Sequence, residues 1–197
     1  MLAAQLASAG ALPEVLPAVA DDDEAHRRAL ERALEADVVV TSGGVSVGPH
    51  DLVRRIEGEL GVREVFWGVA VKPGKPLSFG VRDGTLVFGL PGNPVSSLVG
   101  FELFVRPAVE ALQGAAEPRP RLESGTIAAA VRRNGDRDQF LRGNREPDGA
   151  GLPRIAPLRG QESHMIARAA SADVLVHVPR GEGEIPAGAG IRFLPLS

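Results

Sequence analysis

One segment constrains the fold of this chain more than any other: an apolar run, a glycine pair and a helical pattern follow one another directly. Residues 37–40 are typical of a buried strand, and the pattern that begins at Leu52 is typical of a helix. Between them lie Ser42, Gly43 and Gly44. In an open α/β sheet, the loop from a strand's carboxyl end into a helix is the usual ligand crevice. Glycines let the backbone approach a ligand closely and turn N–H groups toward an anion, so this loop predicts a phosphate site.

Composition excludes several classes of function. Hydrophobic residues make up 44% and charged residues 24%, as in ordinary globular proteins, and the net charge of −3 provides no basic field for nucleic acid or an anionic membrane. No apolar run approaches the roughly 20 residues that cross a bilayer, and no signal-peptide pattern is present. Because cysteine is absent, disulfides, cysteine–zinc sites and thiol nucleophiles are excluded. We therefore expect a cytoplasmic protein with a small-molecule substrate and with no nucleic-acid or membrane partner.

The periodicity changes once along the chain. Helix and strand patterns alternate over residues 1–114, which predicts an α/β domain. Residues 115–121 are rich in alanine and proline and predict a linker. Short strands separated by turns fill residues 122–197 and predict a small β-barrel or sandwich. The predicted helices are 1–9, 21–36, 51–60 and 95–112, with a possible helical turn at 163–170; the predicted strands are 12–16, 37–41, 62–71, 77–81, 85–89, 126–131, 139–142, 154–157, 174–178 and 191–194.

Three loops follow predicted strands in the α/β domain. The first is the glycine loop with Asp51 beyond it, the second is 72–76 with Lys72 and Lys75, and the third, 90–94, opens a helix. If they meet at one crevice, they combine backbone donors, two ammonium groups, a helix amino terminus and a carboxylate. Such a set suits a phosphorylated ligand, with Mg²⁺ on the carboxylate offsetting repulsion.

Each feature alone has a simpler interpretation. The pair Gly43–Gly44 fits any tight strand-to-helix turn, and Asp51 fits a helix cap. Asp21 fits the charged first turn of a helix. For Lys72 and Lys75 the flanking prolines and glycine fix the loop in a way that two solvated lysines do not require, which favours a functional role.

Together the motifs are more specific. Ser-Gly-Gly-Val-Ser-Val-Gly at 42–48, Lys-Pro-Gly-Lys-Pro at 72–76 and Leu-Pro-Gly-Asn-Pro-Val-Ser at 90–96 resemble, in order and spacing, the molybdopterin molybdenumtransferase family of the MoeA and gephyrin E-domain type. The resemblance begins in the first helix of the family's molybdopterin-binding domain and continues into its C-terminal domain. Residues 139–143 and 160–165 are similar to motifs of that second domain. It implies a three-layer, MogA-like α/β domain without its first strand, followed by a small β-barrel domain.

The resemblance also implies a reaction and its residues. The family inserts molybdenum from molybdate into adenylylated molybdopterin, releases AMP, requires Mg²⁺ and completes its site across a homodimer. By motif match, Asp51, Lys72 and Asp21 take the catalytic positions, and the two aspartates hold the metal. The residues that would bind the substrate are Ser42, Gly43, Gly44, Ser46, Lys75, Pro91, Gly92, Asn93 and Pro94.

The chain departs from the family pattern in ways that leave alternatives open. Gly68 stands where the family commonly has a basic residue, and the first strand with its Thr-Gly-Asp-Glu-Leu motif is absent, as are two amino-terminal domains. We therefore expect an incomplete or shortened member. A non-catalytic molybdopterin-binding or scaffold protein of the same fold is the first alternative. A nucleotide-processing hydrolase of the same superfamily is the second, although that group carries a Thr-Gly-Gly-Leu-Gly-Pro-Thr loop. Molybdate and tungstate are not distinguished.

Overall fold

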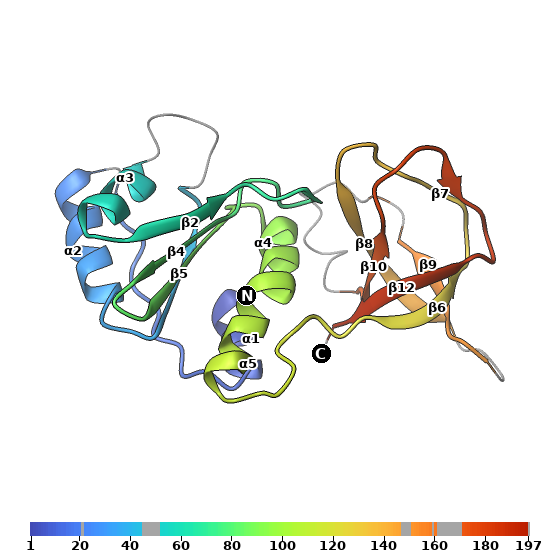
Figure 1. The fold of residues 1–197 in the computed structure, drawn as a ribbon, viewed down its shortest axis with the longest axis horizontal. Coiled ribbons are helices and arrows are strands. Elements are labelled where there is room, and N and C mark those ends of the chain that lie inside the picture. Colours follow the sequence, from blue (N-terminus) through green and yellow to red (C-terminus); the bar gives the residue numbers. More distant parts are fainter. Residues whose placement is uncertain (21, 45–51, 147–150, 159, 161–170, 197) are drawn as a thin grey trace. The chain divides into compact units, whose positions relative to one another are not determined.

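The structure is a computed structural model (Figure 1), which describes residues 1–20, 22–44, 52–146, 151–158, 160 and 171–196. The elements, in chain order, are α1 Leu2–Ser8, α2 Asp23–Ala33, β1 Val38–Ser42, α3 Leu52–Glu59, β2 Arg63–Trp67, β3 Val71–Lys72, β4 Ser78–Arg82, β5 Thr85–Leu90, α4 Pro94–Gly100, the π-helix η1 Phe101–Val105, α5 Arg106–Leu112, β6 Glu123–Ile127, β7 Val131–Arg132, β8 Asp138–Glu146, β9 Arg154–Pro157, β10 Val174–Val178, β11 Glu184–Ile185 and β12 Gly190–Pro195. The chain forms two compact units, Met1–Val69 with Gly74–Pro118, and Ala70–Pro73 with Arg119–Ser197.

The first unit is built on a four-stranded sheet in the order β1-β5-β4-β2. β1 runs parallel to β5, with Val38 opposite Leu86 and Ser42 opposite Leu90, and β4 is antiparallel to both β5 and β2. β1, β5 and β2 therefore point the same way. Their carboxyl ends lie along one edge of the sheet, which is also where β4 begins.

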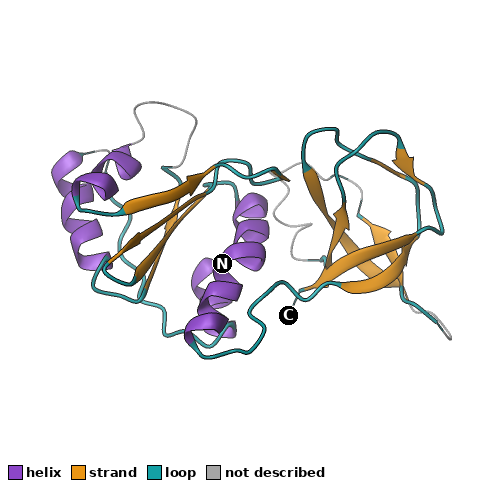
Figure 2. Cartoon of the chain, in the orientation of Figure 1, coloured by secondary structure: helices purple, strands orange, loops and turns teal. Residues whose placement is uncertain are grey.

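Helices cover both faces of this sheet (Figure 2). On one face, α1, η1 and α5 contribute to an apolar cluster with Leu77, Phe88 and Leu90, and α4 contacts β5. On the other face, Leu34, the residue that follows α2, belongs to an apolar cluster with Val39 and Val87, and α3 packs against α2. Because successive side chains of a strand alternate between faces, the valines of β1 contribute to both cores. The three-layer α/β architecture is thus confirmed.

Local sequence explains two connections. Asp83 and Gly84 both have positive φ angles (49° and 95°), so they form the tight turn that the Asp-Gly pair predicts between β4 and β5. The predicted helix over 95–112 is continuous but contains the π-helix η1 just before Pro107. Since proline lacks an N–H group and its ring crowds the preceding turn, the wider π turn accommodates it without a break.

Other expectations were wrong in detail. Residues 12–16 form no strand; Leu12 is fully exposed and Val15 is 74% exposed. The strand expected over 62–71 is divided into β2 and β3, because Gly68 turns the backbone at φ 82°. The strand expected over 126–131 is likewise divided into β6 and β7. The helical turn expected at 163–170 lies outside the described residues.

The second unit contains a closed five-stranded barrel. Its strands follow the order β10-β12-β6-β9-β8, and β10 pairs again with β8 to close the ring, so the barrel rather than the sandwich is correct. Ile127, Ile155, Val176 and Phe193 fill the interior. β3, although it lies between β2 and β4 in sequence, extends this sheet by pairing in parallel with β8. None of the helices in the described part of the chain is long and apolar enough to cross a membrane.

Candidate functional site

Two of the loops predicted to bind a ligand lie against each other at the carboxyl edge of the first unit's sheet. The amide of Gly43 donates to the carbonyl oxygen of Leu90 at 2.9 Å, which extends the pairing of β1 with β5 by one residue. A Cβ atom at Gly92 would lie 3.6 Å from the Cα of Gly43. The backbones of the two loops are therefore in van der Waals proximity, as the parallel pairing of their strands requires.

Glycine is needed at Gly43 and Gly44 for backbone conformation. Their φ angles are 90° and 71°, in the left-handed region that residues with a side chain rarely adopt. The N–H of Gly43 is already bonded to Leu90, so within the described loop only the exposed Gly44 offers an amide with no recorded partner. Ser42 is exposed beside it and adds a hydroxyl. The predicted row of free amides thus reduces, among described residues, to one amide and one hydroxyl.

The third loop differs from the expectation that the amino terminus of α4 is an open anion site. The side-chain oxygen of Asn93 accepts from the amides of Val95 at 3.1 Å and Ser96 at 3.3 Å. The amide of Ser97 donates to the carbonyl oxygen of Asn93 at 2.9 Å. Pro94 has no N–H, so every first-turn donor of α4 is satisfied within the chain. Asn93 is therefore a helix cap, and only the helix dipole remains to favour an anion.

The lysine loop begins and ends at the same edge. The amide of Gly68 donates to the carbonyl oxygen of Leu77 at 2.8 Å, and the amide of Val69 donates to the backbone carbonyl oxygen of Lys75 at 3.0 Å. A Cβ atom at Gly74 would lie 3.6 Å from the carbonyl oxygen of Ser96 in α4, so this loop reaches the first turn of that helix. The described parts of the three loops that belong to the first unit thus meet at one edge, as predicted.

The two lysines of this loop belong to different units. Lys75 is in the first unit, whereas Lys72 is in β3 and pairs with Gln139 of the barrel sheet. Both side chains are exposed, and neither forms an ion pair with another described residue. They are the only lysines in a sequence that otherwise uses arginine as its basic residue. This bias in composition was a second signal, besides the motif, that singled out the two lysines.

Two buried polar atoms at this edge have no hydrogen-bond partner among the described residues: the Thr41 hydroxyl and the indole N–H of Trp67. Thr41 is the next-to-last residue of β1, before the glycine loop, and Trp67 is the last residue of β2, before the segment that leads to the lysine loop. Arg54 lies over the indole ring at 5.2 Å. A buried indole N–H normally finds a partner, so Trp67 joins the candidate site. Trp67 was not singled out from the sequence; its position as the last residue of β2 was the available signal.

The predicted metal ligands, Asp21 and Asp51, lie outside the described residues, as does Ser46, which was predicted to bind the substrate. No group of three or more His, Cys, Asp or Glu side chains that could hold a metal occurs within the described residues.

In the barrel unit, a carboxylate lies next to β3. Asp138 faces Val71 across the parallel pair, and its side chain accepts from the amide of Arg180 at 2.8 Å and lies 3.2 Å from Nε2 of His177. The Arg180 amide, followed by His177, lowers the pKa of Asp138 below its ordinary value. This carboxylate is thus committed to the barrel's own structure.

Comparison with known proteins agrees with this architecture. Residues 1–111 match a family model described as a probable molybdopterin binding domain, and residues 113–196 match the MoeA C-terminal region (domain IV). The chain belongs to the molybdopterin molybdenumtransferase family of the MoeA type. The family resemblance inferred from the three motifs is therefore confirmed.

Individual relatives show how much of the family architecture is present. Molybdopterin molybdenumtransferase 2 of Mycobacterium tuberculosis is 35% identical over 204 residues, which cover 100% of this chain and 49% of that protein. The Haemophilus influenzae molybdopterin molybdenumtransferase is 32% identical over 164 residues, 83% of this chain and 40% of that one. The structure of the MoeA protein of Pyrococcus horikosii superposes with a TM-score of 0.80 at 28% identity, covering 98% of this chain and 46% of that chain. The chain spans about half the length, or less, of these relatives.

Proposed function

We propose that this chain acts in molybdenum cofactor biosynthesis, binding adenylylated molybdopterin and inserting molybdenum from molybdate with release of AMP. The observation that carries the proposal is the meeting of the Gly43–Gly44 loop, the Gly92–Asn93 turn and the Lys75 loop at one edge of the sheet, in a chain of this family. The carboxyl ends of β1, β5 and β2 lie at this edge, and open α/β sheets bind ligands outside the carboxyl ends of their strands.

The chain's own groups have distinct tasks in this proposal. The Gly44 amide and the Ser42 hydroxyl bind phosphate oxygens, and the Lys75 ammonium offsets their charge. Lys72 is proposed on the motif match alone to act on the oxyanion molybdate, which is a substrate and not a resident cofactor. Pro91 and Pro94 hold the turn in shape, and Asn93 holds the start of α4. Asp51 and Asp21 are proposed as Mg²⁺ ligands on the motif match alone.

The direct experiment mixes the purified chain with adenylylated molybdopterin, molybdate and Mg²⁺ and measures AMP. We expect Lys75→Ala, Lys72→Ala and Asp51→Asn to lower the rate at least tenfold. Arg82→Ala is the matched control, because this cation lies at the opposite edge of the sheet, at the β4–β5 turn, and should leave the rate unchanged. Equal AMP release by all variants would contradict the assignment.

A non-catalytic, molybdopterin-binding role is the second candidate, and Gly68 favours it. The φ of 82° at Gly68 is a conformation in which a lysine or arginine would be strained, so the basic residue common in the family is not simply accommodated here. Binding of adenylylated molybdopterin without AMP release would select this role. Sedimentation of the chain, alone and with ligand, tests the proposed homodimer.

A further inference from the structure

The hydrogen bonds that join β1 to β5 stop one bond short of the turn at Gly92. In a parallel pair these bonds are evenly spaced, so each position in the series can be worked out from the others. Leu86 donates to the carbonyl oxygen of Asp37 at the start of the pair, and Gly43 donates to Leu90 at its end. The next bond would run from the amide of Gly92 to the carbonyl oxygen of Gly43. That bond does not occur between these two described residues.

The missing bond leaves the amide of Gly92 available. The two loops are close, since a Cβ atom at Gly92 would lie 3.6 Å from the Cα of Gly43, so distance does not prevent the bond. Gly92 is exposed, and its amide has no recorded partner among the described residues. A backbone N–H that is not paired within the chain bonds to water or to a ligand. A second free donor therefore lies on the loop next to the amide of Gly44.

The side chain of Ser97 in α4 accounts for this arrangement. Ser97 is only 1% exposed, and its hydroxyl donates to the backbone carbonyl oxygen of Pro91, two residues before the helix cap. The carbonyl oxygen of Asn93 also lies 3.1 Å from this hydroxyl, but it already accepts from the amide of Ser97 at 2.9 Å. The carbonyl of Pro91 has no other donor among the described residues. The single proton of the hydroxyl therefore serves Pro91.

The geometry of the peptide between Pro91 and Gly92 links this hydroxyl to the free amide. The peptide is trans, and in a planar trans peptide the C=O and N–H groups point in opposite directions. Because the carbonyl of Pro91 points toward Ser97, the N–H of Gly92 points away from α4. Rotating the peptide to complete the series of bonds with β1 would move the carbonyl away from the Ser97 hydroxyl.

The residues on either side of this peptide do not fix its orientation by themselves. Glycine has no Cβ atom, so Gly92 tolerates either orientation of the peptide before it at little cost. The ring of Pro91 fixes φ but leaves ψ, the angle that rotates this peptide, without a covalent restraint. The bond from Ser97 is therefore the recorded contact that selects the orientation in which the Gly92 amide stays free.

We propose that Ser97 is a positioning residue of the candidate site, because its hydroxyl holds the Pro91–Gly92 peptide so that the Gly92 amide donates to a phosphate oxygen of the ligand. Ser97 itself does not touch the ligand. A bond from a backbone amide to an anionic oxygen is strong, and it contributes most when the donor is oriented before the ligand arrives. The amides in the first turn of α4 take no part, since Asn93 caps them. The inference rests on the proposed function for the identity of the ligand.

The test follows one NMR signal. In an HNCO spectrum of the isotope-labelled full chain, a single peak joins the amide of Gly92 to the carbonyl carbon of Pro91, so this peak reports the orientation of their peptide. Inorganic pyrophosphate is the probe, because it carries phosphate oxygens without the rest of the proposed ligand. We expect the peak to move in a saturable manner, with the amide proton shifting downfield as it donates to the anion.

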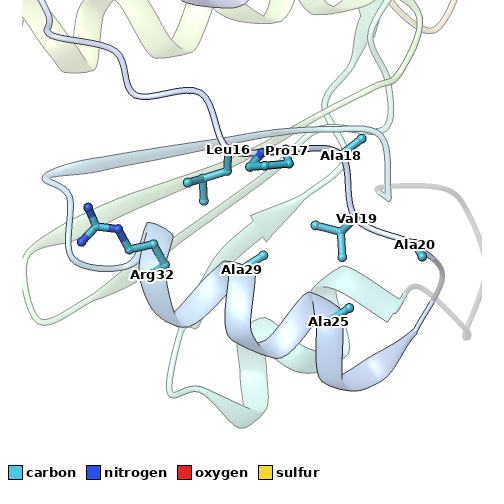
Figure 3. Close-up of a pocket in the computed structure, with 8 residues that line it drawn as sticks. All are labelled: Leu16, Pro17, Ala18, Val19, Ala20, Ala25, Ala29 and Arg32. Carbon is cyan, nitrogen blue, oxygen red and sulfur yellow. The ribbon is translucent and has the colours of Figure 1, made fainter.

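The amide peaks of Ala25 and Ala29 serve as the internal reference. Both residues line an apolar cavity of about 320 Å³ between residues 16–20 and α2 (Figure 3). The charged side chain in this lining, Arg32, forms ion pairs with Glu14 and Glu35, so the cavity offers a phosphate group no free cation. These two peaks should not move as pyrophosphate is added.

Variants separate positioning from a merely structural role. Ser97→Ala should move the Gly92 peak before any probe is added and weaken pyrophosphate binding about tenfold. Ser97→Thr keeps a hydroxyl that can bond to a carbonyl of the preceding turn and should restore both. Thr85→Val is the matched control, because the Thr85 hydroxyl also donates to a backbone carbonyl, that of Ala36 at 2.9 Å, but at the opposite edge of the sheet. Ser97→Ala and Thr85→Val should both lower the melting temperature, and only Ser97→Ala should change the Gly92 peak.

The inference and the proposed reaction can fail separately. A Gly92 peak that pyrophosphate does not move in the wild-type chain overturns the inference, as does a Ser97→Ala chain that binds pyrophosphate as tightly as Thr85→Val. A wild-type chain that gives the expected titration, is weakened by Ser97→Ala and releases no AMP from adenylylated molybdopterin supports the inference and refutes the reaction.

Discussion

Substitutions of Asn93 test whether the loop at 90–94 serves only to cap α4 or also binds the ligand. The motif predicts a substrate contact, whereas the structure uses its side-chain oxygen to cap α4. Asn93→Ala removes this oxygen and leaves the amides of Val95 and Ser96 without a partner. Both of these residues are buried, at 2% and 7% exposure, so water cannot readily replace the lost bonds.

The expected loss of stability follows from that burial. Replacing a cap residue by alanine costs about 0.5–2 kcal/mol, with solvent-accessible caps at the low end. Two buried amides lose their acceptor here, although both bonds are rather long, so we expect about 1.5 kcal/mol. Asn93→Ser keeps a capping oxygen, so its free energy of unfolding should fall by only a few tenths of a kcal/mol. Asn93→Asp keeps the cap and adds a negative charge at the positive end of the helix dipole, so it should be at least as stable as wild type.

Urea unfolding of the three variants measures these differences, and ligand binding separates the two roles. If the loop contributes to an anion site, Asn93→Asp should bind adenylylated molybdopterin at least tenfold more weakly while remaining stable, because its new charge repels phosphate. Asn93→Ser should bind nearly as wild type. An alanine variant as stable as wild type would refute the cap. An aspartate variant that binds normally would refute the placing of the anion at this loop.

Three further predictions test other parts of the structure. Gly43→Ala should lower the free energy of unfolding by about 1–2 kcal/mol through its φ of 90° alone, since no atom lies within 4 Å of the added Cβ. Gly92→Ala should leave the free energy of unfolding nearly unchanged, and urea unfolding of both variants checks the difference. Arg106→Ala should cost about 3 kcal/mol, because it leaves the Glu102 carboxylate, only 4% exposed, without the cation that binds it at 2.7 Å; the double variant Glu102→Leu/Arg106→Met should recover most of the loss. Asp138 has a lowered pKa in the folded state, so it stabilises the barrel above its unfolded pKa, and this is lost as pH falls below about 4; Asp138→Asn should reduce the acid sensitivity measured by thermal unfolding from pH 6 downward.

Much of the first unit could be predicted because its signals are local. The run before Ser42, the Asp83–Gly84 turn and the proline at the start of α4 each determine a nearby element. The meeting of the loops followed from one general fact, that parallel strands share a carboxyl edge. The strand at 12–16 failed for the opposite reason: its pattern is suitable, but a strand needs a partner, and no described residue pairs with it.

The details of the site depend on pairing that the motif does not encode. Whether the amide of Gly43 is free or bonded is decided by Leu90, far along the chain. The cap of α4 is local by contrast, because Asn93 accepts from the amides of Val95 and Ser96. The buried, unpaired indole N–H of Trp67 is likewise visible only in three dimensions. The roles of Asp21, Ser46 and Asp51 stay predictions, because these residues lie outside the described part of the chain.

The course of β3 has a practical consequence for anyone dividing this protein. Two residues from the middle of the first unit's sequence, Val71 and Lys72, serve as a strand of the barrel sheet, so the polypeptide passes between the two bodies more than once. A barrel fragment that begins after Pro118 would lack β3, so β8 would lose its parallel partner strand and the fragment would lack Lys72. A functional module boundary drawn on sequence alone would therefore separate residues that fold as one piece.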